Sequence, residues 1–246
     1  MIEVRHLQRH FGEQRVLDDV SFRIENGESV AIIGRSGCGK SVLLKHLIGL
    51  LKPDAGEVQI DGENIVTMDE RQLLRVRRKF GMVFQGAALF DSMTVAENVA
   101  FGLRRHEDLT ETEIARRVAD ALEMVDLRNT ENKNPAELSG GMRKRVGLAR
   151  AIVYEPQIVL YDEPTTGLDP IVSDSIDKLM MRVHEQLKVT TVVVTHDMRT
   201  ARRVGNRVFM MHDRTIYASG TPDQFFASQN PVVRQFIDGV ADAKKN

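Results

Sequence analysis

A glycine-rich loop between an apolar strand and an apolar helix constrains this chain more than any other feature. The predicted strand Ser29–Ile33 runs directly into Gly34–Ser41, the glycine loop, and an apolar helix is predicted over Lys40–Leu51. The loop fits the pattern G-x-x-x-x-G-K-[ST], in which glycines let backbone N–H groups close around phosphates. The helix N-terminus adds a favourable dipole. Lys40 is therefore expected to reach the β- and γ-phosphates of a nucleotide, and the Ser41 hydroxyl to bind Mg²⁺.

A coincidental glycine-rich turn that ends in Lys-Ser is the alternative for this segment, and the motifs downstream argue against it. The residues of the segment expected to bind nucleotide are Gly34, Arg35, Ser36, Gly37, Cys38, Gly39, Lys40, Ser41 and Val42. Cys38 is interpreted as a small packing residue rather than a reactive thiol. It is the only cysteine, which excludes an intrachain disulfide and indicates a reducing compartment.

The composition is that of a globular protein without a strong global charge. The 246 residues suffice for one large α/β domain with room for an inserted lobe. A net charge of -1, from 34 basic and 35 acidic residues, disfavours a dedicated nucleic-acid surface. No apolar run approaches the ~18–20 residues that span a bilayer. Because Met1–Arg5 lacks the apolar core of a signal peptide, service to a membrane is expected from the cytoplasmic side.

Two carboxylates follow a second apolar strand, Ile158–Tyr161. Asp162 suits a Mg²⁺ ligand, and Glu163 suits the group that polarises an attacking water. The alternative makes the pair a helix cap and a surface acid ahead of Pro164. His196, after the strand Thr191–Thr195, would by itself more often be a structural hydrogen-bonding residue than a catalyst.

Strands and helices alternate along most of the chain, which predicts a largely parallel sheet. Strands are also predicted at 2–7, 20–24, 57–60, 80–84 and 208–211. Capping-box spacing at Thr94 with Glu97, and at Thr110 with Glu113, predicts two helices, and a third is predicted from about Ser139 to Tyr154. The expected single domain, 1–240, divides into a core (1–85 and 156–221), a helical lobe (86–155), C-terminal helices (222–240) and a flexible tail (241–246).

The string Leu138-Ser139-Gly140-Gly141-Met142 resembles the signature of the ATP-binding cassette (ABC) ATPases. This resemblance covers nearly the whole chain and implies a P-loop α/β core, an N-terminal antiparallel β part and an inserted helical part. It implies that Ser139, Gly140, Gly141 and Met142 cap the ATP of a second copy, with Asp169 at the dimer interface. The usual fifth signature residue is Gln, so Met142 removes one polar contact.

The same resemblance assigns roles to residues whose local sequence says little. Gln85 is implied to contact Mg²⁺ and water and to hinge the helical lobe, and His196 to contact the γ-phosphate. Phe11 is implied to stack on adenine, with Val16 beside the base, although a strand aromatic in the core is the alternative. The segment 86–91 is implied to receive a helix of a membrane permease.

Weaker similarities narrow the family. The run Phe84–Val95, the Met142 signature and the tail Val233–Gly239 resemble the Mla/Mce lipid-transport ATPases, also known for lipid asymmetry and toluene tolerance. The implied system lies at the bacterial inner membrane and moves phospholipid or related hydrophobic cargo. Its implied partners are a permease dimer, an Mce-domain protein and a small STAS-domain protein.

Three alternatives stay open from the sequence. The first is the ATPase of a polar amino-acid or solute importer, with the same catalytic residues. The second is a non-transport ABC ATPase of DNA repair or translation, although only 139 − 85 = 54 positions separate Gln85 from Ser139, too few for a long coiled coil. The third concerns the C-terminal helices alone, which pack on their own core or contact a second cassette or accessory protein.

Overall fold

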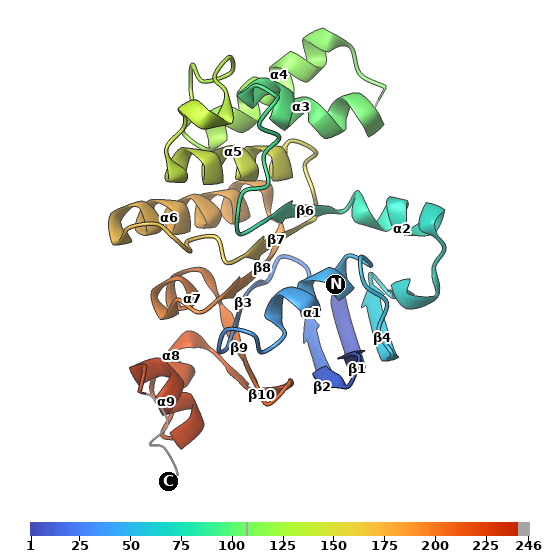
Figure 1. Cartoon of the computed structure of the whole chain (residues 1–246), viewed down its shortest axis with the longest axis vertical. Helices are drawn as coiled ribbons and strands as arrows, with labels where there is room; N and C mark the ends of the chain where they lie inside the picture. Colours follow the sequence, from blue (N-terminus) through green and yellow to red (C-terminus); the bar gives the residue numbers. More distant parts are fainter. Residues whose placement is uncertain (107, 241–246) are drawn as a thin grey trace. The chain divides into compact units, whose positions relative to one another are not determined.

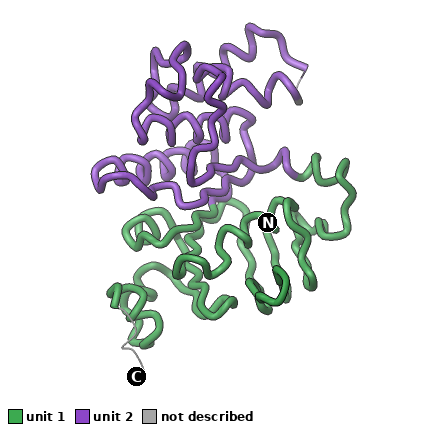
Figure 2. The backbone as a smooth tube through the Cα atoms, viewed as in Figure 1, with its two compact units in different colours: residues 1–76, 192–246 green, residues 77–191 purple. Residues whose placement is uncertain are grey.

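The computed structural model describes residues 1–106 and 108–240, and the predicted flexible tail lies outside this described part. Figure 2 shows the chain as two compact units. Unit 1 contains Met1–Val76 and Val192–Asn246, and unit 2 contains Arg77–Thr191. Both units combine strands with helices, in agreement with the predicted α/β class.

The N-terminal half of unit 1 is built on an antiparallel sheet of order β2-β1-β4-β5. Its strands are β1 (Ile2–Phe11), β2 (Gln14–Ile24), β4 (Ala55–Ile60) and β5 (Glu63–Asn64). Ile2 faces Ile24 on one side and Ile60 on the other, and all three side chains are fully buried. The predicted strand 2–7 continues to Phe11 because irregularities after Val4 interrupt the pairing register without ending the strand.

The rest of unit 1 carries strands in the order β10-β9-β3-β8 (Figure 1). The strands are β3 (Ser29–Ile33), β8 (Thr190–Thr195), β9 (Arg207–His212) and β10 (Thr215–Gly220), and the chain passes from unit 2 to unit 1 within β8. The helices are α1 (Lys40–Leu47), α2 (Glu70–Arg77, whose last residue belongs to unit 2), α7 (Met198–Val204), α8 (Pro222–Phe226) and α9 (Pro231–Asp238), with a 3₁₀ turn at Ile65–Thr67. β3 runs parallel to β9, as predicted.

Helix α1 ends at Leu47, earlier than the predicted Leu51. Gly49 adopts a left-handed conformation (φ 64°) and donates its N–H to the His46 carbonyl, while Leu50 donates to Lys45. These two bonds make a Schellman motif, which terminates a helix regardless of the apolar residues that follow.

The C-terminal helices α8 and α9 pack on the core of their own unit. Phe225 and Val233 are buried in a cluster with Ile33, Val208 and Met210. Phe236 and Ile237 lie partly buried against the same cluster. Own-core packing therefore accounts for the innermost apolar residues of the two helices.

Unit 2 contains two strands, β6 (Phe80–Val83) and β7 (Ile158–Asp162), paired in parallel so that Val83 lies opposite Tyr161. Its helices are α3 (Val95–His106), α4 (Glu111–Met124), α5 (Gly140–Ile152) and α6 (Pro170–Leu187), with a 3₁₀ turn at Pro135–Glu137. In the described part of 86–155 the regular elements are these helices α3 to α5 and the 3₁₀ turn, joined by turns and irregular segments.

The two predicted capping boxes differ in outcome. At the start of α3 the box is complete, since the Thr94 N–H donates to Glu97 and the Glu97 N–H donates to the Thr94 hydroxyl. At α4 the Thr110 hydroxyl accepts from the Glu113 N–H. The Glu113 carboxylate instead pairs with Arg116 and Arg117, because these cations lie one helical turn away.

Among residues 1–106 and 108–240, no helix has the length and apolar character needed to cross a bilayer.

Candidate active site

The glycine loop in unit 1 has no room for side chains at its base. A Cβ on Gly34 would lie 2.6 Å from the carbonyl oxygen of Met211, and one on Gly39 would lie 2.9 Å from that of Val16. Gly39 also caps α1 in a left-handed conformation, φ 102°. The loop tip, Arg35–Gly37, is exposed. The loop therefore presents backbone outward from a tightly packed base.

Lys40 lies across this loop. Its ammonium donates to the carbonyl oxygens of Gly34 (2.8 Å) and Arg35 (3.1 Å), and the residue is only 5% exposed. Ser41, beside it in the first turn of α1, is half-buried. A buried lysine held at the loop by backbone carbonyls is a preformed cation for an anionic ligand.

Cys38 is half-buried inside the glycine loop. Its sulfur lies 2.7 Å from the position a Cβ would take on Gly34. The thiol thus fills the space beside the glycine, in agreement with the interpretation of Cys38 as a small packing residue.

Phe11 lies outside the core. It is 44% exposed, and the Arg9 guanidinium carbon lies 4.7 Å from its ring centroid. The alternative of a buried strand aromatic is therefore wrong. Val16 is half-buried and packs beside Gly39, with a methyl group 3.3 Å from the Cβ position of that glycine. An exposed ring and a neighbouring apolar residue fit a stacking site for a base, which stays a prediction.

In unit 2, Asp162 and Glu163 are both buried at the end of β7. Glu163 adopts a left-handed conformation (φ 50°), rare for a residue with a Cβ, and the Thr166 hydroxyl donates to its carboxylate (3.2 Å). Their burial rules out the alternative of a surface acid at Glu163. Strained backbone at a buried carboxylate is typical of a functional position.

A buried cation lies next to these carboxylates, and the sequence did not single it out. Lys144 of α5 is 8% exposed and donates to the carbonyl oxygen of Gln85, with a longer contact of 3.5 Å to that of Glu163. Burial lowers the pKa of the Lys144 ammonium, while the charges of Glu163 and Asp162 act in the opposite direction. In the sequence, only the basic run Arg143-Lys144-Arg145 after the signature drew attention to this position.

The segment Gln85–Ala88, the Gln85 loop, follows β6. The Gln85 side chain is exposed, whereas Ala87 is buried, and both alanines are left-handed, with φ of 59° and 49°. Arg150 of α5 donates to the carbonyl oxygens of Ala87 (2.8 Å) and Ala88 (2.7 Å). The loop is therefore held in a strained conformation by α5, called the signature helix because the signature residues begin it.

The signature residues start helix α5. Ser139 is exposed, and its hydroxyl accepts from the Met142 N–H at 3.3 Å. A hydroxyl that accepts one bond retains its O–H as a donor, so capping is compatible with a phosphate contact. Gly140 and Gly141 are half-buried, and a Cβ on Gly141 would lie 2.7 Å from Val172.

Asp169 caps the next helix of the same unit. Its carboxylate accepts from the N–H groups of Ile171 (2.9 Å) and Val172 (3.0 Å) at the start of α6. In unit 1, His196 is exposed in the turn between the buried strand β8 and α7, where Asp197 caps α7. The implied roles of both residues stay predictions.

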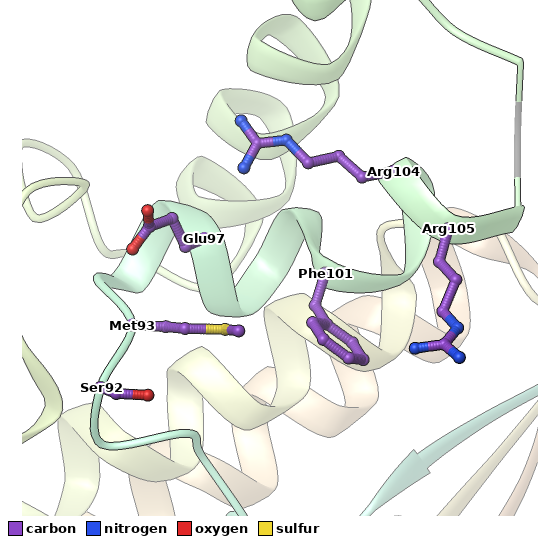
Figure 3. Close-up of a pocket in the computed structure, with 6 residues that line it drawn as sticks. All are labelled: Ser92, Met93, Glu97, Phe101, Arg104 and Arg105. Carbon is purple, nitrogen blue, oxygen red and sulfur yellow. The ribbon is translucent and has the colours of Figure 1, made fainter.

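An open pocket of about 570 Å³ lies on α3 and the segment before it in unit 2 (Figure 3). Its lining combines apolar Met93 and Phe101 with charged side chains; the other lining residues are Ser92, Glu97, Arg104 and Arg105. The half-exposed Phe90 ring packs 4.7 Å from that of Phe101. The pocket therefore adjoins the segment 86–91, whose apolar residues were expected to meet a permease.

Comparisons with known proteins point to one family. A family model described as "ABC transporter" matches residues 17–166. The "Probable ribonucleotide transport ATP-binding protein mkl" of Mycobacterium leprae is 44% identical over 97% of this chain. The chain spans about two thirds of the length of such mycobacterial relatives, 69% of this one. The "Intermembrane phospholipid transport system ATP-binding protein MlaF" of Escherichia coli is 39% identical over 98% of this chain and 90% of MlaF.

Among solved structures, a dimeric ATP-binding cassette, MJ0796, in a post-hydrolysis state bound to ADP and Pi, aligns with a TM-score of 0.82. It is 34% identical, and the match covers 90% of this chain and 99% of that cassette. The antiparallel sheet, the parallel strands and the helical segment described above are those of this fold.

Proposed function

Because this chain belongs to the ABC transporter family as an ATP-binding subunit, we propose that it hydrolyses ATP to move phospholipid or related hydrophobic cargo between bacterial membranes. The observation that carries the proposal is the glycine loop with Lys40 held across it. The buried carboxylates Asp162 and Glu163 and the likeness to a cassette bound to ADP and Pi support hydrolysis rather than binding alone.

Each catalytic residue has a proposed task. Lys40 and the N–H groups of the glycine loop bind the phosphates, and Phe11 stacks on adenine. Ser41, Asp162 and Gln85 would hold Mg²⁺, which when bound neutralises charge on the phosphate oxygens. Water attacks the γ-phosphorus as its bond to the β-phosphate oxygen breaks. Glu163 orients that water and accepts its proton, giving ADP and phosphate.

Two copies are proposed to share two ATP molecules. Ser139 through Met142 of one copy would contact the γ-phosphate bound by the other, with Asp169 at the interface and His196 at the phosphate of its own copy. The Ser139 O–H and the N-terminus of α5 are the donors available for that contact. Hydrolysis removes the phosphate that both copies hold, so the dimer closes with ATP and opens afterwards.

The membrane partner is proposed to be a permease that inserts a helix at the pocket on α3. Met93 and Phe101 would bury its apolar side, and Arg105 would meet an acidic group, since Arg104 already pairs with Glu111 at 2.8 Å. An Mce-domain protein and a STAS-domain protein are proposed as further partners, and the peripheral location as the cytoplasmic face of the inner membrane. Nucleic acid is not among the proposed partners.

The names of the relatives point to two different cargos. The name of MlaF supports phospholipid. The name of the mycobacterial mkl supports a polar cargo, ribonucleotide, which is the second candidate. The subunit itself need not contact either cargo, so the partners decide the question.

The test is affinity purification of tagged Glu163→Gln protein from native membranes with ATP and Mg²⁺. Recovery of a permease with an Mce-domain protein and bound phospholipid supports the lipid proposal. A permease with a solute-binding protein replaces it with the polar cargo. Ribosomes or DNA without a membrane protein would overturn transport as the function. In parallel, Glu163→Gln should bind ATP but hydrolyse it about 10²–10⁴-fold more slowly than wild type.

A further inference from the structure

One face of the signature helix, α5, packs on the Gln85 loop and donates hydrogen bonds to it. Lys144, Gly147 and Arg150 recur at every third position of α5 and lie on the same side of the helix. Lys144 bonds Gln85, Arg150 bonds Ala87 and Ala88, and a Cβ on Gly147 would lie 3.3 Å from that of Ala87. The helix and the loop therefore form one packed piece of unit 2.

Lys144 reaches both the Gln85 loop and the end of β7. Its ammonium donates to the Gln85 carbonyl and lies 3.5 Å from the carbonyl of Glu163, the residue with the left-handed backbone. Burying an ammonium is unfavourable unless it is well paired. A neutral residue of the same length would avoid that cost. The charge is matched here by two backbone carbonyl oxygens and by the nearby carboxylates of Asp162 and Glu163.

We propose that Lys144 is a positioning residue for ATP hydrolysis, which holds the backbone of Gln85 and of Glu163 in one fixed arrangement behind the catalytic carboxylate. The inference rests on the proposed function, because it assigns Glu163 as the base.

The geometry explains what such a residue does. The left-handed backbones of Ala87, Ala88 and Glu163 are unfavourable for residues with a Cβ and persist only where their surroundings fix them. Lys144 fixes the carbonyl of Glu163, and so the direction in which that side chain leaves the backbone. A displacement of about 1 Å at a catalytic group can lower a rate about 10²-fold. Because Lys144 belongs to the signature helix, a displacement of the signature residues would also move the backbone of Gln85 and Glu163.

The test compares Lys144→Met, which keeps length without charge, with Lys144→Arg, which keeps the charge and donors. Lys178→Met on α6 is the matched control, since Lys178 is 67% exposed and pairs only with Asp174 at 2.8 Å among the contacts described. We expect kcat of Lys144→Met to fall about 10–100-fold with the ATP dissociation constant nearly unchanged. Lys144→Arg should recover most of the turnover, and Lys178→Met should match wild type.

A double-mutant cycle separates positioning from general damage. In a Glu163→Gln background, Lys144→Met should slow the residual hydrolysis by far less than in wild type, because its effect passes through Glu163. Equal losses in both backgrounds would overturn the proposal, as would a Lys144→Met enzyme with normal kcat.

A second neutral variant, Lys144→Gln, keeps the proposal testable if Lys144→Met does not fold. Lys144→Gln keeps one donor for the Gln85 carbonyl and should fold with lowered kcat; if neither neutral variant folds, Lys144 has a structural role only and the proposal is wrong. Absence of hydrolysis by wild type and by Lys178→Met would instead refute the proposed function itself.

Discussion

Gly81→Ala tests how closely the signature helix approaches the sheet of unit 2. Gly81 lies within β6, and a Cβ there would be 2.3 Å from the carbonyl oxygen of Ala151 in α5 and 3.2 Å from Pro156. Carbon–oxygen contacts settle at about 3.3 Å, so the helix and the strand must separate by about 1 Å. A backbone carbonyl cannot rotate aside as a flexible side chain can.

The magnitude follows from two opposing effects. Overpacking a close-packed interior costs roughly 1–3 kcal/mol, and a clash between backbone segments belongs at the upper end. Replacing glycine lowers the entropy of the unfolded chain and stabilises by about 0.4–1 kcal/mol. The free energy of unfolding should therefore fall by about 2 kcal/mol, which lowers Tm by about 4–8 °C in a chain of this size.

Calorimetry of Gly81→Ala beside Gly86→Ala makes the measurement specific. A Cβ on Gly86 meets nothing within 4 Å, so the same entropy gain arises there without a clash. We expect Gly86→Ala to melt at or slightly above the wild-type temperature. Equal Tm values for the two variants would refute the close approach of α5 to β6.

Four further predictions concern single residues. Lys40→Ala should weaken ATP binding at least about tenfold, because a charged hydrogen bond to phosphate contributes about 1.5–3 kcal/mol. Titration with a fluorescent ATP analogue measures the Kd, and an unchanged Kd would contradict the role of Lys40 in phosphate binding. Phe11→Ala should weaken binding about fivefold or more while Phe11→Tyr retains it, since stacking a base contributes about 1–3 kcal/mol; equal affinities would remove adenine stacking. Asp169→Ala loses the cap of α6 and should lower Tm by about 2–4 °C, with Asp169→Asn closer to wild type; a melt that separates neither variant from wild type would argue against the cap. Burial raises the pKa of the Asp126 carboxyl, but hydrogen bonds from Arg182 and Arg145 outweigh burial and hold the pKa below the ordinary value of 3.8. The ionised carboxylate therefore adds stability above that pH, and this stability is lost as the pH falls below it. Asp126→Asn should show a smaller loss of Tm in acid than wild type, and parallel curves of Tm against pH would contradict the assignment.

The parts of the fold that depend on local sequence could be predicted. The strand before the glycine loop, the cap of α3 and the helix after Ser139 all follow from neighbouring residues, and the structure contains each. The end of α1 was missed although Gly49 signalled it, because Leu50 and Leu51 continue the apolar pattern. Helix α6 was not predicted, yet Asp169-Pro170 has the residue types of a helix start.

The parts of the site that depend on distant contacts could not be predicted. Lys144 lies between Arg143 and Arg145, and such a run is typical of a solvated helix face. Its burial arises because the Gln85 loop, 59 positions earlier, folds over it. Asp126 likewise meets Arg182, 56 positions away, in a contact that no local pattern encodes. The exposure of Phe11 was open from sequence for the same reason.

The chain carries a single thiol, and it lies in the glycine loop beside Gly34. Any maleimide or spin label added to this protein would therefore attach first where nucleotide is proposed to bind, and its signal would report on that loop. Cys38→Ser makes the chain free of cysteine while keeping a side chain small enough for the space that Gly34 leaves. Pairs of cysteines introduced on that background, both within one unit, would then report distances inside that unit during turnover.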